Sequence, residues 1–197
     1  EAEKLEGVVL DLQSPFVHEA ARKLTANLIT NVSKETKAAI RQTIFEAIMD
    51  GDAPRVSARE IRQIVGLTRR DALAVRRFAE HASERQVERY STKLLNRRAL
   101  TIARSESLRA CGQGQLAAWR SMAADNLIDT SRFRASWGAT LQSDRTCDIC
   151  APMNGQQVPL GGSFESNEPG VLPSERVPYS GDTVECPPLH PNCRCTI

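Results

Sequence analysis

The feature that most constrains this chain is a pair of short motifs near its C-terminal end. The first is a C-x-x-C motif at Cys147 and Cys150, and the second, forty residues further on, is an H-x-x-C motif at His190 and Cys193. Two intervening residues let a tight turn bring both side chains onto one ion, and thiolates with one imidazole suit tetrahedral zinc. We therefore predict one structural zinc ion bound by these four residues, because four protein ligands leave no open position for a catalytic water.

Other states of the six cysteines stay open. An oxidising compartment would pair the same residues in two disulfides, and a reducing one could leave them as thiols without metal. No signal peptide is visible, and because the chain begins at Glu1 rather than Met we interpret it as a fragment. With the predicted ligand set Cys186 and Cys195 are spare, although Cys195 could replace Cys193 as a ligand.

The charges are unevenly distributed along the chain. Residues 53–109 hold fourteen Lys and Arg against six Asp and Glu, whereas residues 142–197 hold three Arg against seven acids. A basic helical part and an acidic, cysteine-rich part are therefore expected to be distinct units. The basic part could meet nucleic acid or an acidic protein surface, or be a solvated helical face. No apolar run approaches the length of a membrane span, so no membrane partner is expected.

Apolar residues recur at three- and four-residue steps in the first part of the chain and predict helices. One helix is expected over residues 14–29, with Pro15 in its first turn. A second is expected over residues 33–50, with Gly51 in the left-handed conformation at its end.

Two shorter helices are expected next. A Ser-x-x-Glu capping box at residues 57–60 predicts the start of one, which Gly66 ends, and Thr68 is expected to cap the other, which runs to Ala79. Two short helices joined at a glycine could form a DNA-reading helix-turn-helix. The side chains that would contact phosphates, or a protein partner instead, are Arg69, Arg70, Arg76 and Arg77.

Residues 84–125 are expected to form one long helix or two in tandem. Small residues at helical spacing allow another backbone to come close, which is a packing role rather than a catalytic one. Cys111 is expected to be an inert buried thiol in this stripe, and Gly112 and Gly114 to mark a kink. The stripe consists of Ala103, Ser107, Ala110, Cys111, Gly114, Ala117 and Ala118.

The pattern changes to two-residue alternation over residues 133–142, which predicts a strand with one buried face. The following Asp144-Arg145 pair is expected to cap a turn and form an ion pair. Asn154-Gly155 predicts a hairpin turn with a returning strand over residues 157–160, and residues 161–183 read as a long surface loop. The metal would hold the far end of that loop beside the first strand.

These patterns together predict an α+β chain. Residues 1–83 would form a helical N-terminal region. Residues 84–197 would form a small domain made of the long helix, a β-hairpin and a zinc-stapled knuckle of Cys and His residues.

The motifs of the second part resemble those of a known family. Over roughly residues 73–197 the chain resembles the phage head morphogenesis family named after the F protein of phage Mu. The resemblance implies that Cys193 rather than Cys195 is the shared thiol, and Ser105 departs from the threonine usual in the family. The motifs are, in order, Ile102-Ala103-Arg104-Ser105-Glu106, Trp137, Asp144-Arg145-Thr146-Cys147-x-x-Cys150, Asn154-Gly155 and Pro187-Pro188-Leu189-His190-Pro191-Asn192-Cys193-Arg194-Cys195.

The resemblance also implies a function. Members are minor head (capsid) proteins of tailed phages, present in few copies near the portal and acting in head morphogenesis, DNA packaging or genome delivery. The expected partners are the portal and major capsid proteins, with packaged double-stranded DNA as a further candidate. The expected location is the virion, in the head interior or at the portal vertex, after assembly in the host cytoplasm. No enzymatic activity is expected.

Two other functions were weighed against this one. A DNA-binding or DNA-cleaving zinc module would need a histidine-based catalytic centre, for which only His18 and His81 remain. An ADP-ribosyltransferase-like enzyme could use Arg104 and Glu106 as part of an NAD site, but no glycine-rich phosphate cradle accompanies them.

Overall fold

The structure is a computed structural model that describes residues 12–26, 29, 32–139, 147–165 and 183–197. Within these ranges the chain is α+β, as the sequence predicts, with helices first and short strands in the C-terminal region. The elements are α1 (Pro15–Leu24), α2 (Lys34–Met49), α3 (Pro54–Ile64), α4 (Arg69–Ala79), α5 (Glu84–Ala124), β1 (Ala135–Ser136), the 3-10 helix η1 (Ala151–Met153), β2 (Gln157–Val158), β3 (Phe164–Glu165) and β4 (Thr183–Val184).

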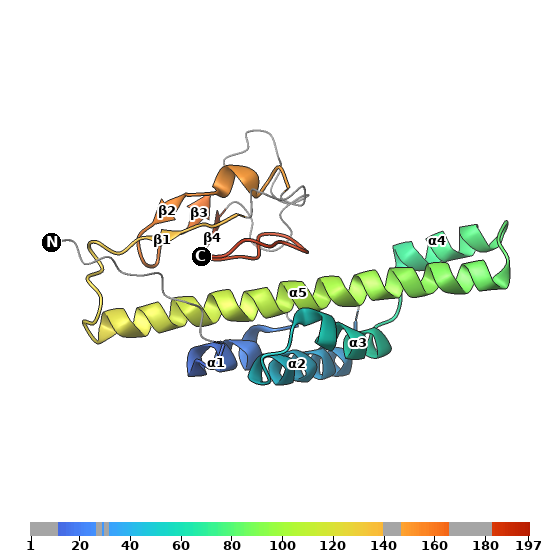
Figure 1. The fold of residues 1–197 in the computed structure, drawn as a ribbon, viewed down its shortest axis with the longest axis horizontal. Helices are drawn as coiled ribbons and strands as arrows, with labels where there is room; N and C mark the ends of the chain where they lie inside the picture. Colours follow the sequence, from blue (N-terminus) through green and yellow to red (C-terminus); the bar gives the residue numbers. More distant parts are fainter. Residues whose placement is uncertain (1–11, 27–28, 30–31, 140–146, 166–182) are drawn as a thin grey trace.

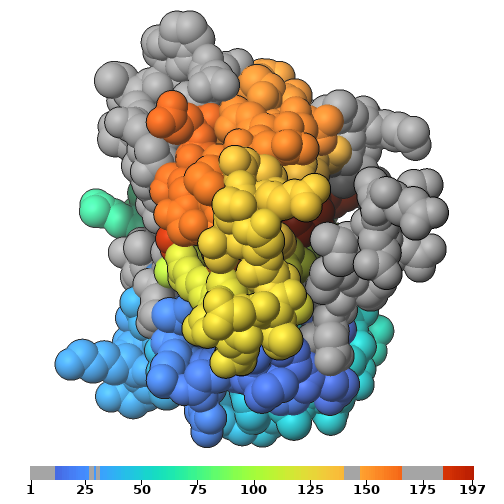
Figure 2. Space-filling view, turned by 90° about the vertical axis from the view of Figure 1, so that its left-hand side faces the viewer, coloured from blue at the N-terminus to red at the C-terminus, as the bar shows by residue number. Residues whose placement is uncertain are grey.

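The 41-residue helix α5 is the axis of the molecule. Helices α1, α2 and α3 lie along one side of it, and the strands with the C-terminal cysteines lie on the other (Figure 1). The end-on view in Figure 2 shows the same order, with the N-terminal helices in blue and cyan below the yellow end of α5 and the orange residues above it. Among the described residues, no helix is both apolar enough and long enough to cross a membrane.

Helices α1, α2 and α3 bury their apolar faces against the middle of α5. We call this group of buried side chains the helical core. Its larger members come from α1 to α3, and α5 contributes mostly alanine, so the partner helices can approach its backbone closely. The helical core consists of Val17, Ala21, Ala26, Ile29, Ile40, Ile44, Ile48, Ala58, Ile61, Val65, Ala99, Ile102, Ala103 and Ala110.

Gly114 shows why the stripe on α5 is made of small residues. A Cβ atom at this position would lie 2.5 Å from Cα of Val17, so only glycine lets α1 pack where it does. The expected close approach of another backbone is confirmed. The expected kink is wrong, because α5 continues without interruption through Gly112 and Gly114.

The ends of α2 follow the local sequence signals. The Ser33 hydroxyl accepts a hydrogen bond from the Thr36 N–H at 3.1 Å, and Gly51 has φ +71°. The N–H groups of Gly51 and Asp52 bond back to the carbonyls of Ile48 and Ala47, as in a Schellman motif. The predicted start and stop of this helix are therefore confirmed.

The prediction for α1 was too long and the one for α3 began too late. Helix α1 ends at Leu24, since Thr25 is extended and Ala26 has φ +63°. Helix α3 begins at Pro54, one turn before the supposed capping box, because the fixed φ of proline suits the first helical position. The Ser57 hydroxyl accordingly lies inside the helix and donates to the Pro54 carbonyl instead of capping it.

Two short antiparallel ribbons, β1–β2 and β3–β4, build the C-terminal part. Of the described residues in the predicted strand over 133–142, only Ala135–Ser136 form a strand, so the predicted length was wrong. The alternation holds as far as Trp137, since Ala135 and Trp137 are buried and Ser136 is exposed. A turn forms at Asn154-Gly155 as predicted, with Gly155 at φ +79° and its neighbour at φ −58°, ψ 126°. These angles define a type II turn rather than the tighter type that the dipeptide favours in two-residue hairpins. The turn follows η1 rather than a strand, so it is not a hairpin turn, and the returning strand covers only Gln157–Val158.

Both ends of the predicted loop over residues 161–183 are strands, so that prediction was wrong there. Phe164 is fully buried, and its ring lies 5.2 Å from that of Trp137, which fixes β3 in the interior. Residues 140–142 of the predicted strand, the Asp144-Arg145 turn and residues 166–182 lie outside the described ranges.

A second group of buried side chains, which we call the cysteine core, joins the strands to the C-terminal half of α5. Because α5 contributes to both cores, no break between hydrophobic clusters falls at residue 83, and the division there remains a prediction. The cysteine core consists of Leu116, Trp119, Ala135, Trp137, Ile149, Cys150, Met153, Phe164, Cys186, Leu189, Cys193 and Cys195.

Candidate metal centre

The C-x-x-C motif forms a single tight turn. The N–H groups of Cys150 and Ala151 both donate to the Cys147 carbonyl at 3.0 Å, and η1 follows at once. Cys147 is half-buried and Cys150 is buried. This turn places both sulfur atoms on the same side of the chain, as the spacing predicts.

The H-x-x-C motif forms a matching turn. The Cys193 N–H donates to the His190 carbonyl at 3.1 Å, and Asn192 between them has φ +67°. Nδ1 of His190 lies 2.9 Å from the Pro191 carbonyl oxygen. An N–H on Nδ1 donated to that oxygen leaves the Nε2 lone pair free to bind a metal.

The fold brings the two turns together. Nε2 of His190 lies 3.0 Å from Sγ of Cys147 and 3.0 Å from Sγ of Cys150, and the sulfur atoms of Cys150 and Cys193 are 3.8 Å apart. Cys150 and His190, which are forty positions apart in sequence, thus lie in one group with Cys147, and this group could hold a metal ion.

The donor types suit zinc, but the four predicted ligands do not form one group: Cys147, Cys150 and His190 lie together, and Cys193 groups with Cys150 and Cys195 instead. Two sulfur ligands of a tetrahedral zinc ion, with bonds of about 2.3 Å, lie about 3.8 Å apart, which is the separation of Cys150 and Cys193. The imidazole lies closer to its two thiol neighbours than this, at hydrogen-bonding distance, so ligation would spread that side of the cluster slightly.

Cys195 also lies at the cluster. Cys150, Cys193 and Cys195 form a second group whose sulfur atoms are within 4.8 Å of one another. Hydrogen bonds from the Cys150 and then the Cys195 thiol lower the pKa of Cys193, and the same contacts raise the pKa of Cys150.

Helix α5 supports the second turn through a residue that periodicity did not single out. The Ser105 hydroxyl is buried and accepts a hydrogen bond from the Asn192 N–H at 2.9 Å. This bond satisfies the backbone of the one residue in the turn that has a left-handed conformation. In the sequence, Ser105 stood out only because it lies in the family motif.

The neighbouring Glu106 makes an equivalent contact on the other side of α5. Its side chain is 2% exposed, and Oε2 accepts a hydrogen bond from the Ala26 N–H at 2.8 Å. Ala26 is also left-handed and belongs to the helical core. Adjacent residues of α5 thus hold two left-handed turn residues, one from each core, and Glu106 has a structural contact there.

The two remaining cysteines lie away from the cluster. Cys186 is buried and receives a hydrogen bond from the Gln113 amide at 3.1 Å, and burial is the main cause that raises its pKa to about 12. Burial likewise raises the pKa of Cys111 to about 11, as expected for an inert thiol. Neither belongs to a group of metal-ligand side chains among the described residues.

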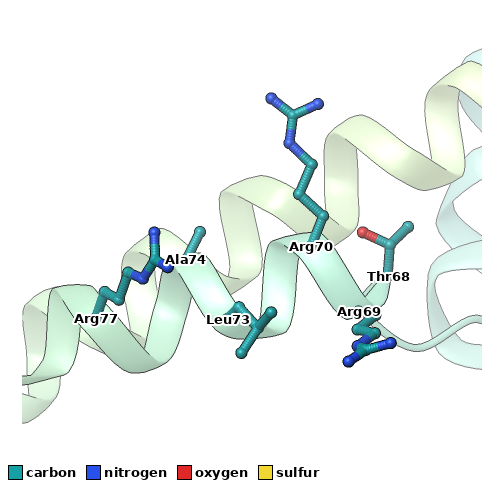
Figure 3. Close-up of a pocket in the computed structure, with 6 residues that line it drawn as sticks. All are labelled: Thr68, Arg69, Arg70, Leu73, Ala74 and Arg77. Carbon is teal, nitrogen blue, oxygen red and sulfur yellow. The ribbon is translucent and has the colours of Figure 1, made fainter.

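The four arginines proposed for DNA or partner contact lie on α4. Arg69, Arg70 and Arg77 line one shallow groove, whereas Arg76 is not part of its lining (Figure 3). The helix-turn-helix alternative gains no support, because α4 packs mainly against α5. Of the two other histidines, His81 is exposed at the end of α4 and His18 packs edge-on against Phe45, and neither joins the metal-ligand groups of the described chain.

A family model described as Phage Mu protein F like protein matches residues 38–197. The chain belongs to the phage Mu F-like family. This membership makes it a phage head morphogenesis protein, and the match starts within α2, well before the region in which the sequence motifs were evident. Neither the curated proteins nor the solved structures gave a match.

Proposed function

We propose that this phage head morphogenesis protein is a structural minor head component that acts at or near the portal, in head assembly, DNA packaging or genome delivery. The observation that carries the proposal is the family match over residues 38–197. Its partners would be the portal and major capsid proteins, and its place would be the head interior or the portal vertex, after assembly in the host cytoplasm.

A non-catalytic role for the metal centre agrees with its composition. Cys147, Cys150, His190 and Cys193 would hold one zinc ion, which when bound supplies a rigid cross-link between two turns. Four protein ligands close a tetrahedral ion, so no site remains for substrate or water. The chain's own contribution is to place the ligands, through the two turns and the Ser105 hydroxyl.

The proposal is tested in particles of the phage or prophage that encodes the chain. A tagged copy should co-purify with mature heads in a number close to that of the portal subunit and far below that of the major capsid protein, as measured by quantitative mass spectrometry. Cross-linking should then join it to the portal or to the capsid subunits that surround it. Absence from the particles, or a copy number like that of the major capsid protein, would contradict the proposal.

Deletion of the gene separates the three stages. Loss of closed heads would indicate assembly, empty heads would indicate packaging, and full but non-infectious heads would indicate delivery. Complementation by His190→Ala should fail and complementation by Cys186→Ser should succeed, because only His190 belongs to the metal cluster. Plasmid nicking and NAD turnover by the purified chain should both be absent.

A further inference from the structure

The hairpin made by α4 and the first turns of α5 projects beyond the rest of the helices (Figure 1). No residue from Gly66 to Lys93 is fully buried, although every one is described. Leu73 is 45% exposed and Phe78 is 40% exposed, even though the Phe78 ring packs on that of Tyr90. Phe78 lies five residues after Leu73 and therefore on a different face of α4, and Leu73 is the large apolar residue exposed on its own face.

A groove of about 570 Å³ runs along this face, and its residues follow helical spacing. Leu73 and Ala74 give it an apolar middle. Arg69 and Arg70 lie one turn before them and Arg77 one turn after, so positive charge stands at both ends of the apolar part (Figure 3).

The three groove arginines have no ion pair among the described residues. Asp71 is the one acid between Thr68 and Arg77. Its carboxylate pairs with Arg97 at 3.1 Å and accepts a hydrogen bond from the Thr68 hydroxyl at 2.8 Å. The groove therefore presents these guanidinium groups, without ion-pair partners in the described chain, on either side of an apolar strip. A ligand with carboxylates on either side of an apolar side chain would complement it.

We propose that this groove binds an acidic amphipathic helix of a partner protein. An apolar side chain of that helix would lie on Leu73, and carboxylates one turn to either side would pair with Arg70 and Arg77. Helix-in-groove recognition uses such anchors at three- and four-residue spacing. The proposal concerns the partner's chemistry and does not depend on where the protein sits in the head.

The same observations fit DNA less well. Leu73 and Ala74 occupy the middle of the groove, where they offer nothing to a phosphate. Beyond the groove, the tip of the hairpin carries the exposed acids Glu80, Glu84 and Glu88, which a long polyanion would have to pass. A short acidic helix can occupy the groove without reaching that tip.

The test uses the full chain and three fluorescent probes. The first is a designed peptide of about five helical turns with leucine on one face and glutamate on both flanks. The second has the same composition in scrambled order, and the third is a DNA duplex of similar length. The groove variants are Arg70→Glu with Arg77→Glu, and Leu73→Ala alone. Arg85→Glu with Arg89→Glu is the matched control, because it makes the same charge change on exposed residues of the hairpin outside the groove lining.

The amphipathic peptide should bind more tightly than the scrambled one. The paired groove reversal should weaken its binding at least about ten-fold, as loss of charge-assisted hydrogen bonds does, and Leu73→Ala should weaken it measurably, while the control pair leaves it unchanged. Equal binding of both peptides would overturn the proposal. Binding of the duplex with a steep salt dependence that Leu73→Ala leaves unchanged would also overturn it, because that result identifies a phosphate-binding surface. The absence of binding by any probe at low salt would overturn it as well.

Discussion

The two cores of this molecule are held together by different means. The helical core buries aliphatic side chains along three helices against α5, with regular backbone hydrogen bonds throughout. The cysteine core rests on two-residue strands and tight turns, and six of its twelve buried residues are cysteines or tryptophans. Three of these, Cys150, Cys193 and Cys195, belong to the metal-ligand groups. Among the described residues of the second region there is little regular hydrogen bonding, and we propose that a metal cross-link there takes the place of the helix packing in the first.

Metal removal should produce the largest difference in stability between the two regions. Structural zinc contributes on the order of 10 kcal/mol in small isolated sites, so chelation should unfold the region after Phe133 while the helices largely survive. Circular dichroism should retain most of the helical signal, and hydrogen exchange should rise only in the C-terminal region. Cys150→Ser and His190→Ala should act like the chelator.

Cys186→Ser and Cys111→Ser are the controls for that experiment, because both residues lie outside the metal-ligand groups. Elemental analysis of the reduced, purified chain should give one zinc per chain. A chain without stoichiometric metal, or with Cys147–Cys150 or Cys193–Cys195 joined as a disulfide, would show that a metal ion does not stabilise the cysteine core.

The substitution Gly114→Ala should damage the helical core in turn. The new Cβ would meet the Val17 backbone, which cannot rotate away, so a loss of about 3 kcal/mol, at the upper end for overpacking, is expected. Denaturant unfolding measures it. Gly66→Ala is the control, because nothing lies within 4 Å of its added Cβ. Equal stability of the two variants would mean that α1 does not pack on α5 as described.

Ser105 and Glu106 test whether one helix serves both regions. Ser105→Ala should speed metal loss to a colorimetric chelator, because the Asn192 N–H loses its acceptor, at a cost of about 1–2 kcal/mol. Glu106→Ala should instead raise hydrogen exchange near Ala26 and leave the metal in place. Ser105→Thr and Glu106→Gln keep an acceptor oxygen and should behave like the parent chain. Identical profiles for the two alanine variants would refute separate roles.

The smallest effect is expected at Cys111. Burial raises the pKa of this thiol to about 11, and only the thiolate reacts with alkylating reagents. Because the pKa is raised, Cys111 should stay unlabelled by iodoacetamide at pH 8 and become reactive only as the pH approaches that value. Mass spectrometry of the folded, metal-loaded chain checks this. Rapid labelling at pH 8 would show that packing against the helical core does not bury the Cys111 thiol.

The sequence determined the features that depend on neighbouring residues. Thr68 caps its helix as predicted, and Ser33, predicted as the start of its helix, caps α2; each accepts a hydrogen bond from an N–H three residues on. The Asn154-Gly155 turn and the tight turns of the C-x-x-C and H-x-x-C motifs also form, and Cys147 and Cys150 share one metal-ligand group, although His190 and Cys193 do not. Such features could be predicted because a cap or a turn is fixed by backbone geometry within four residues, whatever the rest of the chain does.

Tertiary structure alone decided which distant residues meet. Nothing in the local pattern around Ser105 and Glu106 says that one holds Asn192 and the other Ala26, because both partners are defined by how the chain packs on α5. The stripe of small residues predicted that some backbone comes close to Gly114, but only the fold shows that this backbone is that of Val17 in α1. Strands β3 and β4 were missed for the same reason, since two residues carry no periodicity and the burial of Phe164 against Trp137 is what fixes β3.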